Sequence, residues 1–149
     1  MKLGLMTLGD LLEDPVTGTA MTPEERYRML IDAAVLCDEA GFHSINLGEH
    51  HGLGYEISSP PVLLAAIAER TTDLRLSTAV TLLANLDTFR LAEDYATVDV
   101  ISGGRVEIVA VSAELPPPIQ IGGTPVCSGF GITGSPLIDG RNRPSQSTP

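Results

Sequence analysis

Strand-like and helix-like patterns of apolar residues alternate along the chain through residue 111. Four apolar runs, at 2–8, 44–48, 74–81 and 105–111, have the length and composition of buried strands. The stretches between these runs repeat apolar residues at helical spacing. The order is therefore βαβαβαβ, which is typical of a parallel sheet with right-handed crossovers.

Each predicted helix has a recognisable start. Thr22-Pro23-Glu24-Glu25 combines an N-cap threonine, a proline at the first helical position and a capping-box glutamate. Ser59-Pro60-Pro61 begins the second helix and Asp87-Thr88 the third. Gly41 and Gly103-Gly104 provide stops after the first and third helices.

Two architectures fit this order of elements, an open doubly wound sheet and part of a (β/α)₈ barrel. The first strand-to-helix loop, Leu8-Gly9-Asp10-Leu11-Leu12-Glu13, lacks the G-x-G-x-x-G fingerprint of dinucleotide-binding folds. A closed barrel normally needs about 250 residues. This chain has 149 residues and supplies four predicted strands, so we expect an α/β fold equivalent to part of a barrel.

The character of the chain changes at about residue 112. Residues 113–149 hold seven of the eleven prolines and six of the fifteen glycines, without helical periodicity. We therefore expect a half-barrel over 1–112 and an irregular tail over 113–149. A remnant strand is expected at 119–122, where Ile-Gln-Ile-Gly runs into a glycine turn.

Charge and composition exclude several classes of protein. Nine basic residues against nineteen acidic ones give a net charge of −10 without a basic stripe, so we expect no nucleic-acid partner. No apolar run is long enough to cross a bilayer. Cys37 and Cys127 lack the spacing of a zinc site or a disulfide framework. These features favour a cytoplasmic protein without a membrane partner.

Glu49-His50-His51 is the strongest candidate for chemistry. It lies at the predicted C-terminal tip of the second strand, where parallel α/β folds place their sites. Strand alternation would put Asn46 and His50 on one face, with Gly48 leaving room between them, and would turn Glu49 away. An imidazole there suits acid–base chemistry near neutral pH, although a histidine packed in the core or exposed at the surface is the alternative.

The same triplet could be interpreted as a set of metal ligands. Adjacent strand residues point to opposite faces, so Glu49, His50 and His51 would not converge easily on one ion. We therefore expect no metal site.

Three segments, in this order and spacing, resemble the luciferase-like, flavin-dependent monooxygenase family. They are Glu49-His50-His51, the strand Leu76-Ser77-Thr78-Ala79-Val80, and the run from Ala96 to Glu107, which reads A-T-V-D-V-I-S-G-G-R-V-E. The last of these matches the family pattern in which (A)T(L/V)D and SGGR precede a strand. The resemblance covers roughly residues 2–110, about half of a family barrel.

The resemblance implies a (β/α)₈ barrel that binds reduced FMN, or a deazaflavin in some branches, at the C-terminal ends of its strands. Such enzymes oxidise an aldehyde or another small organic substrate with molecular oxygen, and a flavin reductase is an expected partner. His50 would act in acid–base chemistry beside the flavin. Ala79 and Val80 would lie against the flavin ring, often through a non-prolyl cis peptide, unless they are ordinary strand-core residues.

The chain also departs from the family pattern. After the fourth strand the family continues with Gly-Arg-Gly, whose arginine helps to hold the flavin phosphate, whereas this chain has Val111-Ser112-Ala113. The segment from Pro117 to Pro125 resembles a late barrel strand that belongs far downstream. We therefore expect a truncated or rearranged member of the family. The alternative to flavin chemistry is an inactive fragment that forms a homo-oligomer or binds a partner through its open sheet edges.

Overall fold

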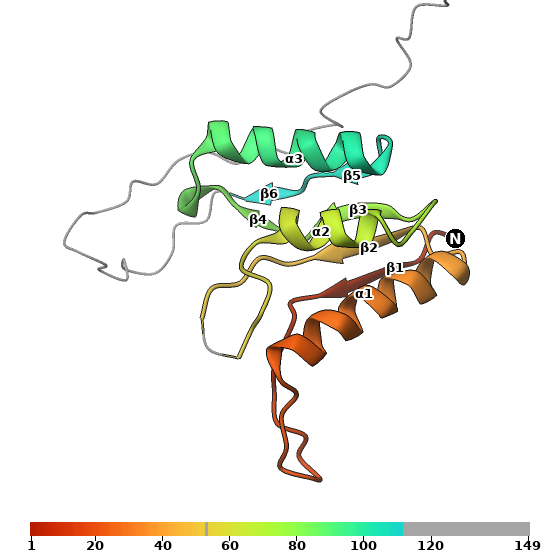
Figure 1. Ribbon diagram of the computed structural model, residues 1–149. Coiled ribbons are helices and arrows are strands. Elements are labelled where there is room, and N and C mark those ends of the chain that lie inside the picture. The colour runs from red at the N-terminus through yellow and green to blue at the C-terminus, as the bar shows by residue number, and fades with distance from the viewer. Residues whose placement is uncertain (53, 112–149) are drawn as a thin grey trace, which may run out of the picture.

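The computed structural model describes residues 1–52 and 54–111, and Figure 1 shows their arrangement. A four-stranded parallel sheet has the order β1-β2-β3-β5. Its strands are β1 (Gly4–Thr7), β2 (Ser44–Leu47), β3 (Arg75–Thr78) and β5 (Val106–Glu107). The expected α/β fold with strands in chain order, as in part of a barrel wall, is confirmed. The expectations for the tail at 113–149 and for a strand at 119–122 lie outside the described residues.

The described residues contain three α-helices, which connect successive strands (Figure 1). They are α1 (Pro23–Glu39), α2 (Pro60–Ala68) and α3 (Thr88–Ser102). Within this part of the chain, no helix has both the length and the apolar character needed to cross a membrane.

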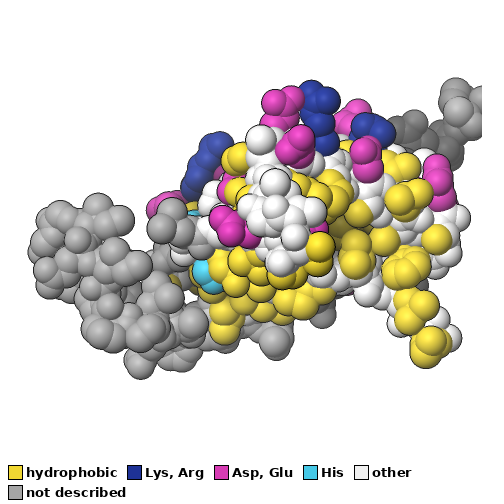
Figure 2. All heavy atoms as spheres, turned by 90° about the horizontal axis from the view of Figure 1, so that it is seen from below, with side chains coloured by type: hydrophobic (Ala, Val, Ile, Leu, Met, Phe, Trp, Pro, Cys, Tyr) yellow, Lys and Arg dark blue, Asp and Glu magenta, His cyan; other side chains and the backbone are white. Residues whose placement is uncertain are grey.

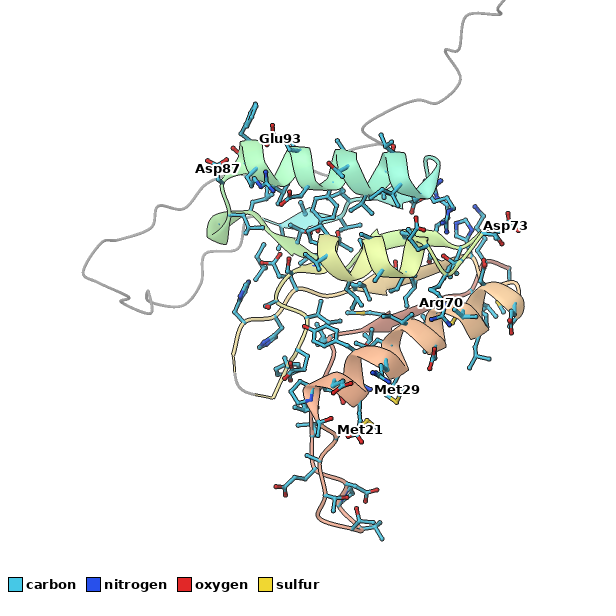
Figure 3. The ribbon with its side chains drawn as sticks, viewed as in Figure 1. Met21, Met29, Arg70, Asp73, Asp87 and Glu93 are labelled. Atoms are coloured by element: carbon cyan, nitrogen blue, oxygen red, sulfur yellow. The ribbon has the colours of Figure 1, made fainter. Side chains whose placement is uncertain are left out.

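The predicted helix ends are confirmed. At the start of α1, the Glu25 amide donates to Thr22 Oγ1 over 3.2 Å, and the Thr22 amide donates to the Glu25 carboxylate over 2.9 Å. Asp87 accepts from the Arg90 amide at 2.8 Å, and Figure 3 shows it at the beginning of α3. Gly103 ends α3 with a left-handed φ of 72°.

The hydrophobic core lies between the sheet and the helices. Ile45, Leu47 and Leu76 are fully buried and come from alternate positions of β2 and β3. Leu64 and Ile67 of α2 belong to the same cluster and are also fully buried. This packing fixes which face of each strand is apolar, and therefore which side chains remain for the opposite face.

The third and fourth strands are interrupted, contrary to the unbroken runs expected at 74–81 and 105–111. β3 ends at Thr78, the Ala79–Val80 peptide is cis, and the chain resumes as β4 (Thr81–Leu82). β4 pairs in parallel with β6 (Ala110–Val111), and a 3₁₀ turn, η1 (Leu83–Asn85), follows β4.

A threonine side chain explains how the interruption is tolerated. Thr78 Oγ1 accepts from the Val109 amide at 2.9 Å and donates to the Val109 carbonyl at 2.8 Å. The buried hydroxyl therefore gives the Val109 amide an acceptor and adds a second donor to the Val109 carbonyl, which also accepts from the Thr81 amide.

The loops after β1 and β2 pair with each other and form what we call the loop ribbon, residues 9–11 with 54–57. Asp10 and Tyr55 form an antiparallel bridge. The Leu11 amide donates to the Gly54 carbonyl at 2.7 Å, and the Glu56 amide donates to the Gly9 carbonyl at 2.9 Å. Two loops far apart in the sequence are thus held together beside the C-terminal ends of their strands.

Candidate functional site

The candidate site lies at the C-terminal ends of β2 and β3. Two segments meet there, residues 48–51 after β2 and residues 79–82 after β3. The Ala79 amide donates to the Leu47 carbonyl at 2.7 Å, and the Glu49 amide donates to the Val80 carbonyl at 3.0 Å. The structure therefore brings the predicted cofactor-binding pair Ala79–Val80 against the segment that carries His50. Its peptide bond is cis, as the family resemblance implied.

His50 is held by its backbone and by one aromatic neighbour. Its amide donates to the Ile57 carbonyl at 2.9 Å, and its ring stacks on Tyr55 with centroids 3.9 Å apart and an interplanar angle of 29°. Its Nδ1 atom is buried and has no hydrogen-bond partner among the described residues. Buried polar atoms are rarely left unpaired, so Nδ1 is a candidate contact for a ligand.

The space expected between Asn46 and His50 is filled by protein, so that part of the sequence interpretation is wrong. Asn46 Nδ2 donates to the Leu5 carbonyl at 3.0 Å and lies 3.1 Å from Ser44 Oγ. A Cβ atom on Gly48 would come within 2.3 Å of Leu8 Cδ2 and 2.9 Å of the Ala79 carbonyl oxygen. Gly48 is therefore needed for close approach of neighbouring protein segments.

The carboxylate of Glu49 is completely buried and joins two segments, a role that sequence reasoning missed. Its Oε1 lies 2.7 Å from His51 Nε2, and its Oε2 accepts from the Leu82 amide at 3.0 Å. His51 itself remains 43% exposed. The sequence did contain an indication of this role, because strand alternation places Glu49 on the same face as the buried residues Ile45 and Leu47.

A second polar pair lies next to this cluster. Thr81 Oγ1 and the Tyr95 hydroxyl are 2.6 Å apart, and both residues are buried. Burial raises the pKa of Tyr95, the hydrogen bond with Thr81 opposes that shift, and the negative charge of Glu49 adds to it. Tyr95 is therefore a neutral hydrogen-bonding group near neutral pH.

Two kinds of ligand contact have no candidate in the described part of the site, an arginine for a phosphate and a cluster of side chains for a metal ion. Val111 is the last described residue. It occupies the first of the three positions at which the family pattern has Gly-Arg-Gly, and its side chain carries no charge that could bind a phosphate. No group of three or more potential metal ligands occurs within residues 1–52 and 54–111. The described site thus offers an imidazole and a backbone surface, and the sequence has no arginine at positions 111–113.

The chain matches known proteins along most of its length. The family model described as luciferase-like monooxygenase matches residues 1–126. Over 88 residues the chain is 33% identical to the oxygenase component of a flavin-dependent trigonelline monooxygenase from Acinetobacter baylyi, covering 58% of this chain and 24% of that protein. It is also 33% identical over 87 residues to a 4-hydroxyprotoasukamycin monooxygenase from Streptomyces nodosus, covering 58% of this chain and 24% of that protein.

Solved structures give the same picture. The crystal structure of monooxygenase RslO1 from Streptomyces bottropensis superposes with a TM-score of 0.67 and 31% identity, covering 78% of this chain and 34% of that one. The oxygenating constituent of 3,6-diketocamphane monooxygenase from Pseudomonas putida, in complex with FMN, shares the fold with a TM-score of 0.67 at 23% identity, covering 78% of this chain and 30% of that one.

These matches define the family and also the extent of the likeness. The chain spans only about a quarter to a third of the length of the relatives it matches. Their common fold is consistent with the four-stranded parallel sheet described above, and the family model covers well over half of the chain. This chain belongs to the luciferase-like monooxygenase family.

Proposed function

We propose that this chain forms part of a flavin site that supports oxidation of a small, aldehyde-like organic substrate by reduced flavin and molecular oxygen. One observation carries the proposal. The buried Nδ1 of His50 has no protein partner among the described residues and belongs to the segment that touches Val80. An imidazole so placed at the C-terminal end of a parallel sheet suits proton transfer to or from a bound ligand.

Reduced FMN is the proposed cofactor, with a deazaflavin as the alternative. Similar structures use both kinds: 3,6-diketocamphane monooxygenase is in complex with FMN, and a tetrahydromethanopterin reductase depends on coenzyme F420. Ala79 and Val80 would present a backbone surface to the flavin ring. When bound, the reduced flavin supplies the electrons that activate oxygen.

The protein's own part in this chemistry is to hold a proton at a defined atom. Tyr55 stacks on the His50 ring, and the Ile57 carbonyl fixes its backbone, so the direction of Nδ1 is set before a ligand binds. His50 is then the proposed catalytic residue, because imidazole nitrogens serve as general acids and bases and Nδ1 is the ring atom without a protein partner among the described residues.

A flavin reductase is the proposed partner. The trigonelline monooxygenase relative is described as an oxygenase component, which implies a separate protein that supplies its reduced flavin. We extend that arrangement to this chain as part of the proposal.

Association through sheet edges is the second candidate function, and one observation favours it. β1 and β5 each lack a neighbouring strand on one side within the described part of the chain. Leu3 and Met6 on or beside β1 are 50% and 58% exposed, and Figure 2 shows hydrophobic side chains gathered over much of one face. Unpaired edges and exposed apolar side chains favour pairing with a second chain. Sedimentation velocity over a range of concentrations would measure that association.

Titration of FMN into the full chain tests the flavin proposal. The missing arginine contacts weaken the phosphate interaction, and losing two or three charge-assisted hydrogen bonds corresponds to roughly two to six powers of ten in affinity. We therefore expect binding in the high micromolar range and little turnover with oxygen and a long-chain aldehyde. His50→Ala should weaken binding further, whereas His43→Ala, which removes an exposed contact with Lys2, should leave it unchanged.

The outcomes separate the two candidates. If neither reduced nor oxidised FMN binds, the flavin proposal is wrong for this chain. Sub-micromolar binding that His50→Ala abolishes would instead exclude the inactive-fragment alternative. Such a result would also mean that a partial barrel, alone or associated, builds a working site.

A further inference from the structure

The buried carboxylate of Glu49 is the only described side chain that contacts both segments of the candidate site through hydrogen bonds. It reaches His51 Nε2 at 2.7 Å through one oxygen and the Leu82 amide at 3.0 Å through the other. Its own backbone amide donates to the Val80 carbonyl at 3.0 Å. From these contacts we propose that Glu49 is a positioning residue that holds residues 79–82 against the His50 segment.

Burial makes these contacts strong determinants of geometry. The Glu49 side chain has no exposed surface, so its oxygens cannot exchange a protein partner for bulk water. A buried carboxylate is tolerated where donors satisfy it, and hydrogen bonds to a charged acceptor are stronger than neutral ones. Displacing residues 79–82 would leave Glu49 Oε2 and the Leu82 amide unpaired.

Residues 79–82 have other contacts as well: the Ala79 amide donates to the Leu47 carbonyl at 2.7 Å, and Thr81 Oγ1 lies 2.6 Å from the Tyr95 hydroxyl. On the side away from Glu49, the Thr81 amide donates to the Val109 carbonyl at 2.8 Å, and β4 consists of Thr81 and Leu82 alone. A strand of this length cannot define its own position through ladder hydrogen bonds. On the side of the His50 segment, backbone hydrogen bonds hold Ala79 and Val80, and the Glu49 side chain extends that hold to Leu82.

The pairing with His51 restrains a second side chain. Glu49 Oε1 lies 2.7 Å from His51 Nε2, so the buried carboxyl group holds the orientation of the His51 ring. His51 is partly exposed and lies directly after His50, so this restraint also limits the path of the His50 backbone.

Amide hydrogen exchange measured by NMR on the full chain tests the positioning role without any flavin. We expect Glu49→Ala to speed exchange of the Leu82 amide at least tenfold, because its buried acceptor is lost. Glu49→Asp, one methylene shorter, should do the same and remains informative if the alanine variant does not fold. Glu49→Gln keeps a carbonyl acceptor for Leu82 and should stay within about threefold of wild type.

Two further variants serve as controls for this experiment. His51→Ala removes only the second contact of Glu49 and should leave Leu82 protected. Asp38→Ala loses carboxylate hydrogen bonds at the opposite end of the sheet and should not affect Leu82 selectively. Unchanged Leu82 exchange in both Glu49→Ala and Glu49→Asp, or equal acceleration in Asp38→Ala, would overturn the inference.

The connection to cofactor binding rests on the proposed function and needs a separate readout. FMN affinity should fall at least tenfold in Glu49→Ala and change less than about threefold in Glu49→Gln and Asp38→Ala. If wild type binds no FMN, the proposed function fails, while the exchange data still decide the positioning role. If wild type binds and Glu49→Ala binds equally well, Glu49 does not position the flavin site.

Discussion

The two ends of the parallel sheet differ in how completely their polar groups are satisfied. At the N-terminal end, the guanidinium of Arg105 donates to five acceptors at 2.8–3.0 Å, supplied by Ser102, Ala68, Leu74 and both the hydroxyl and carbonyl of Thr71. At the C-terminal end, His50 Nδ1 is buried without a partner among the described residues. Parallel α/β folds place their ligand sites at the C-terminal ends of the strands, so this difference supports the role proposed for His50.

Asp38 is a second side chain at the N-terminal end whose polar atoms are all paired. Its carboxylate accepts from the amides of Thr72, Asp73 and Leu74 and from the Thr72 hydroxyl, at 2.7–3.1 Å. Figure 3 shows Asp73 in this loop, at the end of the molecule opposite Asp87. Together Asp38 and Arg105 fix the connection between α2 and β3 from two sides.

Arg105→Ala should give the largest loss of stability. It removes the five hydrogen bonds of the guanidinium group and should lower the free energy of unfolding by about 3 kcal/mol. Burial lowers the pKa of Arg105, although neighbouring Asp38 and Asp73 oppose that shift. Urea denaturation followed by circular dichroism measures the change. Arg105→Lys should recover less than half of it, because an ammonium cannot reproduce the planar fork, and equal stability of wild type and Arg105→Ala would contradict the prediction.

Gly48→Ala should destabilise the opposite end of the sheet by about 2 kcal/mol. The added methyl would overlap Leu8 and the Ala79 carbonyl, so the protein would have to shift around it. A double-mutant cycle with Leu8→Ala checks the cause by urea denaturation. The second substitution should relieve part of the overlap, so additive effects of the two changes would refute this explanation.

Asp38→Ala should cost about 1 kcal/mol at neutral pH, because the carboxylate is partly exposed to solvent. Burial acts to raise the pKa of Asp38, but the hydrogen bonds from Thr72, Asp73 and Leu74 outweigh it and hold the pKa below its usual value. A lowered pKa in the folded state stabilises the protein above the ordinary aspartate pKa, about 4. The stability difference between wild type and variant should therefore shrink as the pH falls below that value. A difference independent of pH from 2.5 to 7 would exclude this linkage.

His50→Ala should have the smallest effect on stability, about 0.5 kcal/mol, because the substitution removes the stacking on Tyr55 but no side-chain hydrogen bond. Its effect should appear in the FMN titration instead. Thermal denaturation and FMN titration of the same sample separate the two quantities. A loss of stability as large as that of Arg105→Ala would abolish the distinction between the two ends.

Local sequence rules predicted the fold well where the controlling interactions are themselves local. The capping box of Thr22 and Glu25 and the N-cap at Asp87 depend on residues within one helical turn. Alternation along β2 likewise identified Ile45 and Leu47 as core residues. Such features could be inferred without knowing what lies elsewhere in the chain.

The remaining features depend on contacts between distant segments. The end of β3 at Thr78 depends on backbone groups of Val109, and the filled space over Gly48 depends on Leu8. The role of Glu49 required knowledge that the Leu82 amide lies beside it. The sequence predicted a candidate site at His50, Ala79 and Val80, but tertiary packing determines which of its atoms have hydrogen-bond partners among the described residues.

The loop ribbon has a consequence for recombination between relatives. Residues 9–11 and 54–57 share backbone hydrogen bonds, and a Cβ on Gly9 would come within 2.6 Å of Ile57 Cγ1. A chimaera that takes only one loop from another family member would therefore combine two loops whose contacts do not fit each other. Exchanging both loops together keeps these contacts, so the two segments have to be exchanged as one unit although more than forty residues separate them.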